Sequence, residues 1–339
     1  MKEAVKSTIR YSLAVILIIV SGYLALKDVE LSKLYEIIVS ADYLWVILPI
    51  PVIMLSHWVR ALRWKTMLNP ILKHSSTWNL FSAVMIGYAA NNVIPRGGEL
   101  LRPYVVSRRE KISFSSTFAT IVVERIIDVI ALVLLFAGVF FFFRDQIINA
   151  LPELDANKIV LPTIVIAIGL VFCLYPPLVR FLLKIFIKPF SQKFYDELNK
   201  IFDKFTKGFD IIRTPKQYVR LAFESILIWL FYTIPLYLMF FAFDFKIDYN
   251  LGFDDAILLI VVSGIGTAIA PTPGAVGVYH FLITNTLTRI YGIAPEIALA
   301  YATVSHGINY LIQVIPGAFF FLRENIKKIP KRADLKSVE

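Results

Sequence analysis

Residues 117–143 read TFATIVVERIIDVIALVLLFAGVFFFF, an apolar stretch that ionisable side chains interrupt near its start. A helix needs about 20 consecutive apolar residues to cross the hydrocarbon core of a bilayer. This stretch has 27 residues, so it is long enough to span with some tilt. We therefore predict a membrane-spanning helix here, and the rest of the chain supports the same environment.

The composition excludes an ordinary soluble domain. The chain has 339 residues, of which 58% are hydrophobic and only 18% charged, with a mean hydropathy of +0.69. Soluble domains are about 45–50% apolar and about a quarter charged. We expect an all-α polytopic membrane protein. The single cysteine, Cys173, and four histidines without zinc-ligand spacing predict no disulfide framework, metal or cofactor.

Six apolar runs are predicted to span the membrane. They cover residues 11–26, 43–59, 117–143, 159–179, 221–243 and 297–322. Two further stretches, 79–94 and 256–270, run into segments rich in proline and glycine, which break helices. Broken helix at membrane depth is tolerated only inside protein or beside water, so we predict two re-entrant or discontinuous helices.

The basic residues predict the orientation. With the N-terminus inside, 28 Lys and Arg residues fall on inner segments and six on outer segments. This bias predicts a multi-pass protein of the inner membrane with both termini cytoplasmic. It also accounts for the net charge of +10 through topology and an anionic inner leaflet, so no nucleic-acid partner is expected.

The predicted order of spans suggests an inverted repeat. The first half is residues 1–189, with a repeat at about 10–144, and the second membrane part is 217–322, with a repeat at about 158–324. Inverted repeats with broken helices are typical of secondary transporters. The alternative is that the predicted spans and re-entrant elements follow this order by chance. Residues 190–216 predict an amphipathic interfacial helix, either a connector or a lipid sensor, and residues 323–339 a charged, disordered cytoplasmic tail.

Three ionisable residues in the span at 117–143 are the first candidates for function. Glu124 and Asp128 share a helix face, Arg125 can reach Asp128, and Asp128 lies close to the midplane. Each charge costs ~2.5–3.5 kcal/mol at the bilayer centre, and the three together nearly cancel the gain from the apolar residues of the span. The charges must face protein or water. They form either an internal salt bridge or a charged lining for a headgroup or a proton.

The first interruption carries the second set of candidates. These residues are Asn91, Asn92, Arg96, Gly97, Gly98, Glu99 and Arg102. The two glycines free backbone amides to point at an anion, and a following helix would add its N-terminal dipole. The two arginines could hold a phosphate, with Glu99 neutralising one of them in its absence. The alternative is a plain cytoplasmic loop.

The second interruption and the last span supply the third set. These residues are Pro273, Gly274, Gly277 and His280, followed by His306, Asn309 and Gln313. The last three are spaced so that they share one helix face. Interhelical hydrogen bonding, which is common in membranes, is the alternative to a ligand site here.

At these motifs the chain resembles a known family. Asn-x-x-Ile-Pro-x-Gly-Gly-Glu-x-x-Arg at 91–102, followed by Glu124-Arg125-x-x-Asp128, looks like the flippase-like transmembrane region of lysylphosphatidylglycerol synthases. Pro-x-Pro-Gly-x-x-Gly at 271–277 resembles the second signature of that family. The chain departs from it at Ala275, where the family usually has glycine, and at His280, where it usually has an acidic residue.

The resemblance implies lipid translocation or an accessory role in envelope biosynthesis. Only about 17 residues follow the last predicted span, so we expect no aminoacyltransferase domain and no synthase activity. The first hypothesis is a transporter of an anionic phospholipid or polyprenyl-phosphate lipid. The second is a membrane enzyme with Glu124 or Asp128 as general base, for which no catalytic motif is found. The third is a non-catalytic partner of a separately encoded glycosyltransferase or synthetase.

Overall fold

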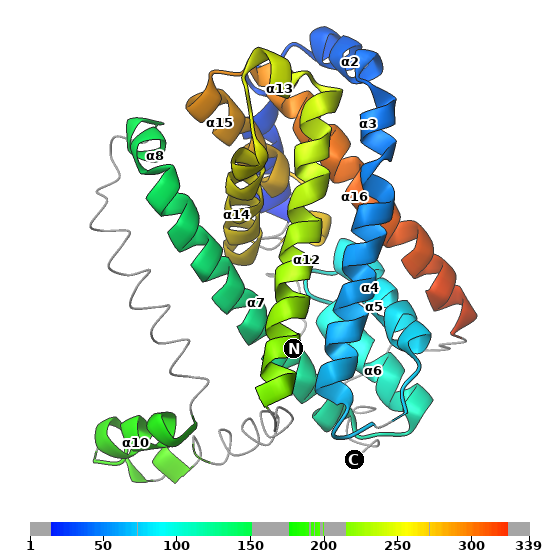
Figure 1. Ribbon diagram of the computed structural model, residues 1–339, viewed down its shortest axis with the longest axis vertical. Coiled ribbons are helices and arrows are strands. Elements are labelled where there is room, and N and C mark those ends of the chain that lie inside the picture. Colours follow the sequence, from blue (N-terminus) through cyan, green and yellow to red (C-terminus); the bar gives the residue numbers. More distant parts are fainter. Residues whose placement is uncertain are drawn as a thin grey trace. The chain divides into compact units, whose positions relative to one another are not determined.

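The computed structural model describes residues 15–72, 74–150, 176–189, 191–192, 194–196, 199, 215–270 and 272–324, and the regular elements of this part of the chain are all helices (Figure 1). In chain order they are the helix Val15–Leu26, α2 (Leu31–Ser40), α3 (Tyr43–Ile47), α4 (Pro49–Leu68), α5 (Thr77–Val93), α6 (Gly98–Glu110), α7 (Phe114–Phe142), α8 (Arg144–Ala150), α10 (Pro176–Phe186), α12 (Pro215–Ala242), α13 (Phe245–Asp248), α14 (Phe253–Ile269), the 3₁₀ helix η1 (Pro273–Ala275), α15 (Val278–Tyr291) and α16 (Pro295–Arg323). The predicted all-α class is confirmed.

Within the described residues, three helices are long and apolar enough to cross a membrane. They are Tyr43–Leu68, Phe114–Phe142 and Lys216–Ala242. The second and third agree with predicted spans to within a few residues. Residues 297–322 lie in α16, which is one continuous helix. Most of the span predicted at 159–179, of the amphipathic helix at 190–216 and of the tail at 323–339 lies outside the described residues.

The span predicted at 43–59 is longer in the structure, and this corrects the sequence analysis. The prediction ends before Arg60 because it assigns the following basic residues to an aqueous loop. The helix instead continues to Leu68, and Arg60 and Arg63 are 5% and 0% exposed. The helix can carry both guanidinium groups into the interior because other helices supply hydrogen-bond partners for them.

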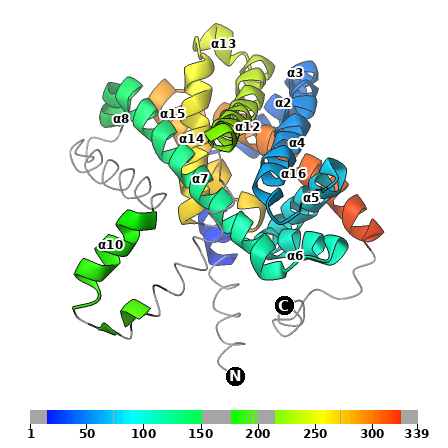
Figure 2. The same ribbon diagram turned by 60° about the horizontal axis from the view of Figure 1, so that its bottom comes forward.

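Both predicted interruptions are present. Residues 94–97, here called the first break, separate α5 from α6. Residues 270–277, here called the second break, separate α14 from α15 and contain η1; Pro271 is outside the described residues. The helices α14 and α15 lie side by side, as do α15 and α16 (Figures 1 and 2).

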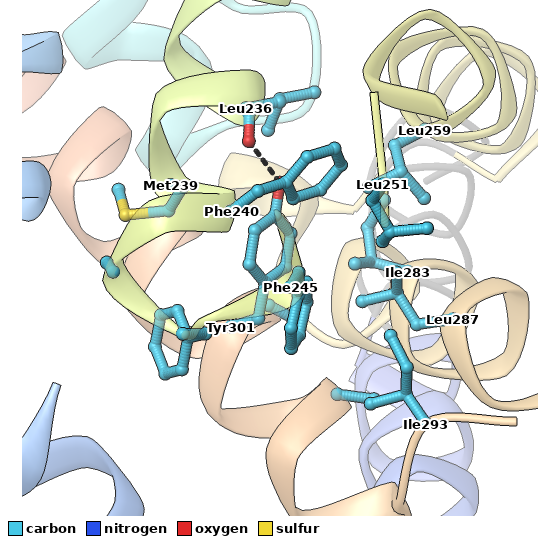
Figure 3. Close-up of a cluster of buried hydrophobic side chains, with 14 of the residues drawn as sticks. Leu236, Met239, Phe240, Phe245, Leu251, Leu259, Ile283, Leu287, Ile293 and Tyr301 are labelled. Carbon is cyan, nitrogen blue, oxygen red and sulfur yellow. Dashed lines mark hydrogen bonds between the residues drawn. The ribbon is translucent and has the colours of Figure 1, made fainter. Parts of the chain in front are cut away.

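The chain divides into two compact units. The first takes its described residues from Met1–Ala61, Phe81–Arg102 and Ile226–Ile329. Its apolar core joins the ends of α12, α14, α15 and α16 around Tyr301, whose hydroxyl donates to the carbonyl of Leu236 over 2.8 Å (Figure 3). Aromatic rings fill the space beside this bond, so the phenol is held both by packing and by its polar end.

The second unit takes its described residues from Leu62–Leu80 and Pro103–Ser225. Here the last turns of α4 pack on α7, and Trp64 donates its indole N–H to Oγ1 of Thr120 over 2.8 Å. Both side chains are fully buried, so this bond satisfies the one polar atom of a large apolar ring. The pairing places Arg63, the residue before Trp64, among the ionisable residues of α7.

Candidate functional site

The first break is a closed turn that uses its own amides. The N–H of Gly97 donates to the carbonyl of Ile94 over 2.8 Å, and the N–H of Gly98 donates to Oδ1 of Asn91 over the same distance. The N–H of Glu99 donates to the carbonyl of Arg96 over 3.2 Å. These bonds stabilise the turn and leave none of the three amides facing outward.

This bonding corrects the predicted amide cradle for an anion. The sequence suggests that Gly97 and Gly98 are small so that their amides can approach a phosphate. In the structure, a methyl group on Gly98 would overlap the backbone carbonyl of Gly87, so Gly98 permits the close crossing of α5 and α6. A methyl group on Gly97 would be tight against Ile94, at 3.0 Å from its Cβ. The glycines therefore serve packing.

The two arginines of the first motif differ in environment. Arg102, in α6, is 6% exposed and its Cβ lies close to Gly87, which argues against a solvated loop cation. Arg96 is exposed, and its Nη2 donates to the carbonyl of Ala268 near the end of α14 over 3.2 Å. Glu99 is half-buried in the first turn of α6. Arg96 thus links the first break to the helix that leads into the second.

The second break depends on two glycines with positive φ. Gly274 has a φ of +59° and Gly277 of +80°, values that favour glycine. A methyl group on Gly274 would lie 2.7 Å from Oδ1 of Asn92, and one on Gly277 would overlap the hydroxyl of Ser21. Pro273 begins η1 directly before the first of them. The end of α5 therefore lies directly against the second break.

One face of α16 completes this arrangement. His306 Nε2 lies 2.7 Å from the carbonyl oxygen of Gly274, and because a carbonyl only accepts, this nitrogen carries the hydrogen. Gln313 accepts from Nδ2 of Asn92 over 3.2 Å and donates to Oδ1 of Asn309 over 3.3 Å. We call these five residues the break network. It joins α5, the second break and α16 within the first unit.

Two aromatic residues of α15 extend the break network. The ring of His280 lies edge-on to His306 with centroids 4.8 Å apart, and the ring of Tyr279 stacks on His306 at 5.1 Å. The hydroxyl of Tyr279 lies 3.1 Å from that of Ser305. Every candidate of the second interruption and the last span is thus near the second break, with His306 at the centre.

The charges of α7 form a second constellation, within the second unit. Nη2 of Arg63 lies 2.5 Å from Oδ1 of Asp128 and 3.8 Å from Oε1 of Glu124. Nη2 of Arg125 lies 3.1 Å from Glu124 and 3.3 Å from Asp128. Nη1 of Arg63 also donates to the hydroxyl of Ser225 over 3.0 Å. Arg63, Glu124, Arg125 and Asp128 are here called the four-charge cluster, whose formal charges cancel.

The four-charge cluster contains a cation, Arg63, that the sequence analysis does not place beside the two acids. Arg63 escapes that analysis because it is counted as a loop residue. Its neighbours provide a signal, since the apolar run resumes after it at Trp64, Met67 and Leu68, all fully buried. A span extended by two turns would have placed Arg63 in the interior.

Arg60 is a second residue that the sequence analysis misses. Its Nη1 donates to the phenol oxygens of Tyr88 over 3.1 Å and Tyr232 over 2.6 Å, and those two hydroxyls lie 3.0 Å apart. The contacts tie α4 to α5 and α12 within the first unit. As for metals, the described residues contain no group of three or more His, Cys, Asp or Glu side chains suited to hold an ion.

Comparison with known proteins identifies the family. Residues 11–317 match the family described as the lysylphosphatidylglycerol synthase TM region. The chain belongs to this family. The matched residues include the break network, the four-charge cluster and both breaks, so the resemblance seen in the motifs is confirmed. Membership also confirms a membrane protein, in agreement with the apolar helices.

Curated relatives in this lysylphosphatidylglycerol synthase TM-region family share about a quarter of their residues with the chain. A UPF0104 membrane protein of Methanocaldococcus jannaschii is 24% identical over 313 residues, 88% of this chain and 91% of that protein. One from Pyrococcus horikoshii is 24% identical over 314 residues, 86% and 91% of the two chains. Glycosyltransferase AglD of Haloferax volcanii is 23% identical over 323 residues, 88% of this chain but 52% of AglD. No solved structure gives a significant match.

Proposed function

We propose that this protein is a lipid transporter that moves an anionic phospholipid or a polyprenyl-phosphate lipid between the leaflets of the inner membrane. The observation that carries the proposal is the break network, in which Asn92, Gly274 and Gln313 bring two interrupted helices together. Interrupted helices whose ends meet near the midplane are a recurrent way to build a transporter site. The acyl chains would stay in the bilayer while the headgroup passes along protein.

The proposed topology has six full spans, two re-entrant elements and an inverted repeat, with both termini cytoplasmic. The pairs α5–α6 and α14–α15 support it, because each is a helical hairpin closed by a glycine-containing break. In this arrangement the two hairpins are the corresponding elements of the two repeats. The headgroup path then follows Arg96 and the polar face of α16, where side-chain amides, an imidazole and a guanidinium supply hydrogen bonds to phosphate oxygens.

An enzyme is the weaker alternative. The carboxylates proposed as general bases, Glu124 and Asp128, both lie within 3.8 Å of arginine side chains. A general base must reach the proton that it removes from the substrate, and ion pairs to two arginines occupy Oε1 of Glu124 and both carboxylate oxygens of Asp128. We therefore propose that the chain itself is not an enzyme.

A partner of a glycosyltransferase is the alternative that one comparison favours. The region similar to this chain makes up about half of a protein named glycosyltransferase AglD. In that alternative, this protein presents a lipid to a separately encoded glycosyltransferase or synthetase. It would use the same headgroup path, but transport alone would not be its activity.

Reconstitution of the purified protein separates these functions. Liposomes would carry headgroup-labelled phosphatidylglycerol, polyprenyl phosphate or phosphatidylcholine, and an impermeant quencher would report how much label reaches the outer leaflet. We expect exchange of the two anionic lipids well above that in protein-free liposomes and above that of phosphatidylcholine. No exchange of any lipid would contradict the proposal, and turnover of an activated sugar or aminoacyl donor would favour the enzyme.

A further inference from the structure

We propose that side chains of α4, α5 and α12 form a binding site for a phosphate group. These side chains are here called the Arg60 cluster, and all belong to the first unit: His57, Arg60, Tyr88, Trp229 and Tyr232. The carrying observation is a buried guanidinium that donates to two phenol oxygens, next to two buried nitrogen atoms that have no hydrogen-bond partner among the described residues. The inference rests on the proposed function only in naming a membrane lipid as the carrier of the phosphate.

Arg60 is the cation of the cluster. It is 5% exposed and lies in a helix that is long and apolar enough to cross a membrane, eight residues or about 12 Å from the end of that helix at Leu68. Its Nη1 donates to the phenol oxygens of Tyr88 over 3.1 Å and of Tyr232 over 2.6 Å. An ionisable residue at this depth is costly, and such residues commonly mark the paths of ions and charged substrates. A guanidinium also suits phosphate, because its planar N–H groups match the spacing of phosphate oxygens.

Two nitrogen atoms beside the phenols are the sign of a ligand. Nε2 of His57 and Nε1 of Trp229 are buried, and neither has a hydrogen-bond partner within the described part of the chain. The His57 ring lies 4.4 Å from that of Tyr88, and the Trp229 ring lies 6.1 Å from that of Tyr232, measured between centroids. Buried polar atoms seldom lack partners, so each exception needs a reason. A ligand held between these rings would account for both atoms.

The hydrogen-bonding groups select the chemistry of this ligand. A guanidinium and an indole N–H can only donate, so the group that Arg60 and Trp229 share must be an acceptor. Phenols can donate as well as accept, and an imidazole nitrogen does either according to its protonation. An oxyanion with several oxygens satisfies all of these groups at once. In a membrane, the phosphate of a lipid headgroup is such an oxyanion.

The exposure of the cluster shows the side from which a ligand can enter. His57 and Arg60 are buried, whereas Tyr88 and Tyr232 are partly exposed. The two phenol oxygens lie 3.0 Å apart and bond to each other. A phosphate that enters between them would replace this bond by bonds to its own oxygens, and would then reach the guanidinium.

The Arg60 cluster lies one helical turn from the break network. Tyr88 and Asn92 are four residues apart in α5, so they share one face of that helix. Asn92 is bonded to Gln313 of α16. A headgroup held at the Arg60 cluster is therefore close to the polar residues that the proposed headgroup path uses.

The test measures lipid binding by the whole protein in mild detergent. The probes are phosphatidylglycerol and diacylglycerol, each labelled on an acyl chain, with inorganic phosphate as a competitor. We expect phosphatidylglycerol to bind and inorganic phosphate to compete with it, while diacylglycerol, which lacks phosphate, binds roughly tenfold more weakly or less. If inorganic phosphate binds but phosphatidylglycerol does not, the site is one for the free ion and the lipid is rejected as its carrier.

Trp229→Phe is the variant that separates binding from folding. It keeps an aromatic ring beside Tyr232 and removes an N–H that has no partner among the described residues. We expect phosphatidylglycerol to bind roughly tenfold more weakly, the effect of one hydrogen bond to a charged group. Trp45→Phe is the matched control, since Trp45 stacks on Phe241 away from the cluster, and it should bind with the parent affinity. Equal affinities in these two variants would overturn the proposal.

Arg60→Lys tests the planar group while keeping the charge. We expect affinity to fall by roughly 10- to 150-fold, against no change in Arg220→Lys, whose arginine is 56% exposed. Thermal unfolding without lipid shows whether each variant is folded, and if Arg60→Lys is not, Trp229→Phe decides. If phosphatidylglycerol binds through Trp229 but no lipid exchange occurs in liposomes, the phosphate site stands and the transport function fails. If exchange occurs and neither exchange nor binding changes in Trp229→Phe, the transport function stands and this site is rejected.

Discussion

Nη2 of Arg63 on α4 lies 2.5 Å from Oδ1 of Asp128 on α7, and both residues also approach the remaining charges of the four-charge cluster. The side chain of Arg63 is fully buried, and that of Asp128 is 17% exposed. In a low-dielectric interior, each charge is tolerated because its partner is present. The contribution of the pair to stability is therefore best measured by comparing the parent protein with variants that lack one partner or both partners.

Arg63→Gln alone should destabilise the protein strongly. It leaves two carboxylates with one arginine, and removal of one partner from a buried ion pair costs ~3–5 kcal/mol. The double variant Arg63→Gln with Asp128→Asn should recover part of this loss, because the cluster is again neutral. Chemical unfolding in mild detergent measures both. The matched control is Arg220→Gln, since Arg220 is 56% exposed and its pair with Glu224 is worth ~0.2–1 kcal/mol. Equal losses in Arg63→Gln and Arg220→Gln would contradict the proposed role of burial.

Gly98→Ala should lower the stability of the protein, whatever its effect on lipid affinity. The added methyl would overlap the carbonyl of Gly87, and such overpacking costs ~1–3 kcal/mol. This reverses the expectation from an amide cradle, in which stability would hold. Gly138→Ala is the control, because it has open space around it in α7 and should be neutral or slightly stabilising. Thermal unfolding of the two variants gives the comparison, and a Gly98→Ala protein as stable as the Gly138→Ala protein would show that α5 and α6 do not need this crossing.

Arg96→Gly should raise stability and lower transport. Arg96 holds a φ of +59°, which costs a non-glycine residue ~1–2 kcal/mol, and strained residues of this kind gather at functional sites. Glycine removes the strain and also removes the guanidinium from the proposed headgroup path. Unfolding and lipid exchange are measured on the same preparation. Exchange at the parent rate would remove Arg96 from the path.

Asn92 and Gln313 should be energetically coupled. A double-mutant cycle with Asn92→Ala and Gln313→Ala should give a coupling energy of ~0.6–1.7 kcal/mol, the range for hydrogen bonds between helices in membranes. Gln313→Ala combined with Ser263→Ala is the control cycle, because Ser263 bonds to a carbonyl of its own helix. Coupling below 0.3 kcal/mol in the first cycle, about the usual additivity error, would show that the break network does not act as a unit.

The sequence predicts the local features of this fold well. The hydrophobic runs locate α7 and α12 because a run of about 20 apolar residues is the length that a helix needs to cross a bilayer. Pro273 and Gly274 locate the second break because their backbone preferences are intrinsic. His306 and Asn309 are found as one helix face because that relation depends only on helical periodicity.

The sequence predicts partners over long distances poorly. The bond from Asn92 to Gln313 joins residues 221 positions apart, and no local pattern specifies it. Arg63 is missed because the rule that assigns basic residues to the inner loops does not consider ion pairs. It therefore cannot recognise an arginine that is buried next to a carboxylate. Gly98 is recognised as essential but for the wrong reason, since its crossing partner Gly87 becomes visible only when α5 and α6 are folded.

The dependence of α7 on Arg63 has a consequence for how the protein is made. By the insertion energies of its residues, α7 is close to neutral between water and lipid when alone, so it is a poor candidate for independent entry into the membrane. Its neutralising partner lies on α4, which leaves the ribosome about 50 residues earlier. Synthesis in chain order therefore produces α4, which carries Arg63, before α7, which needs it. In a circularly permuted protein that began with α7, we expect this helix to insert into the membrane slowly until α4 has been made.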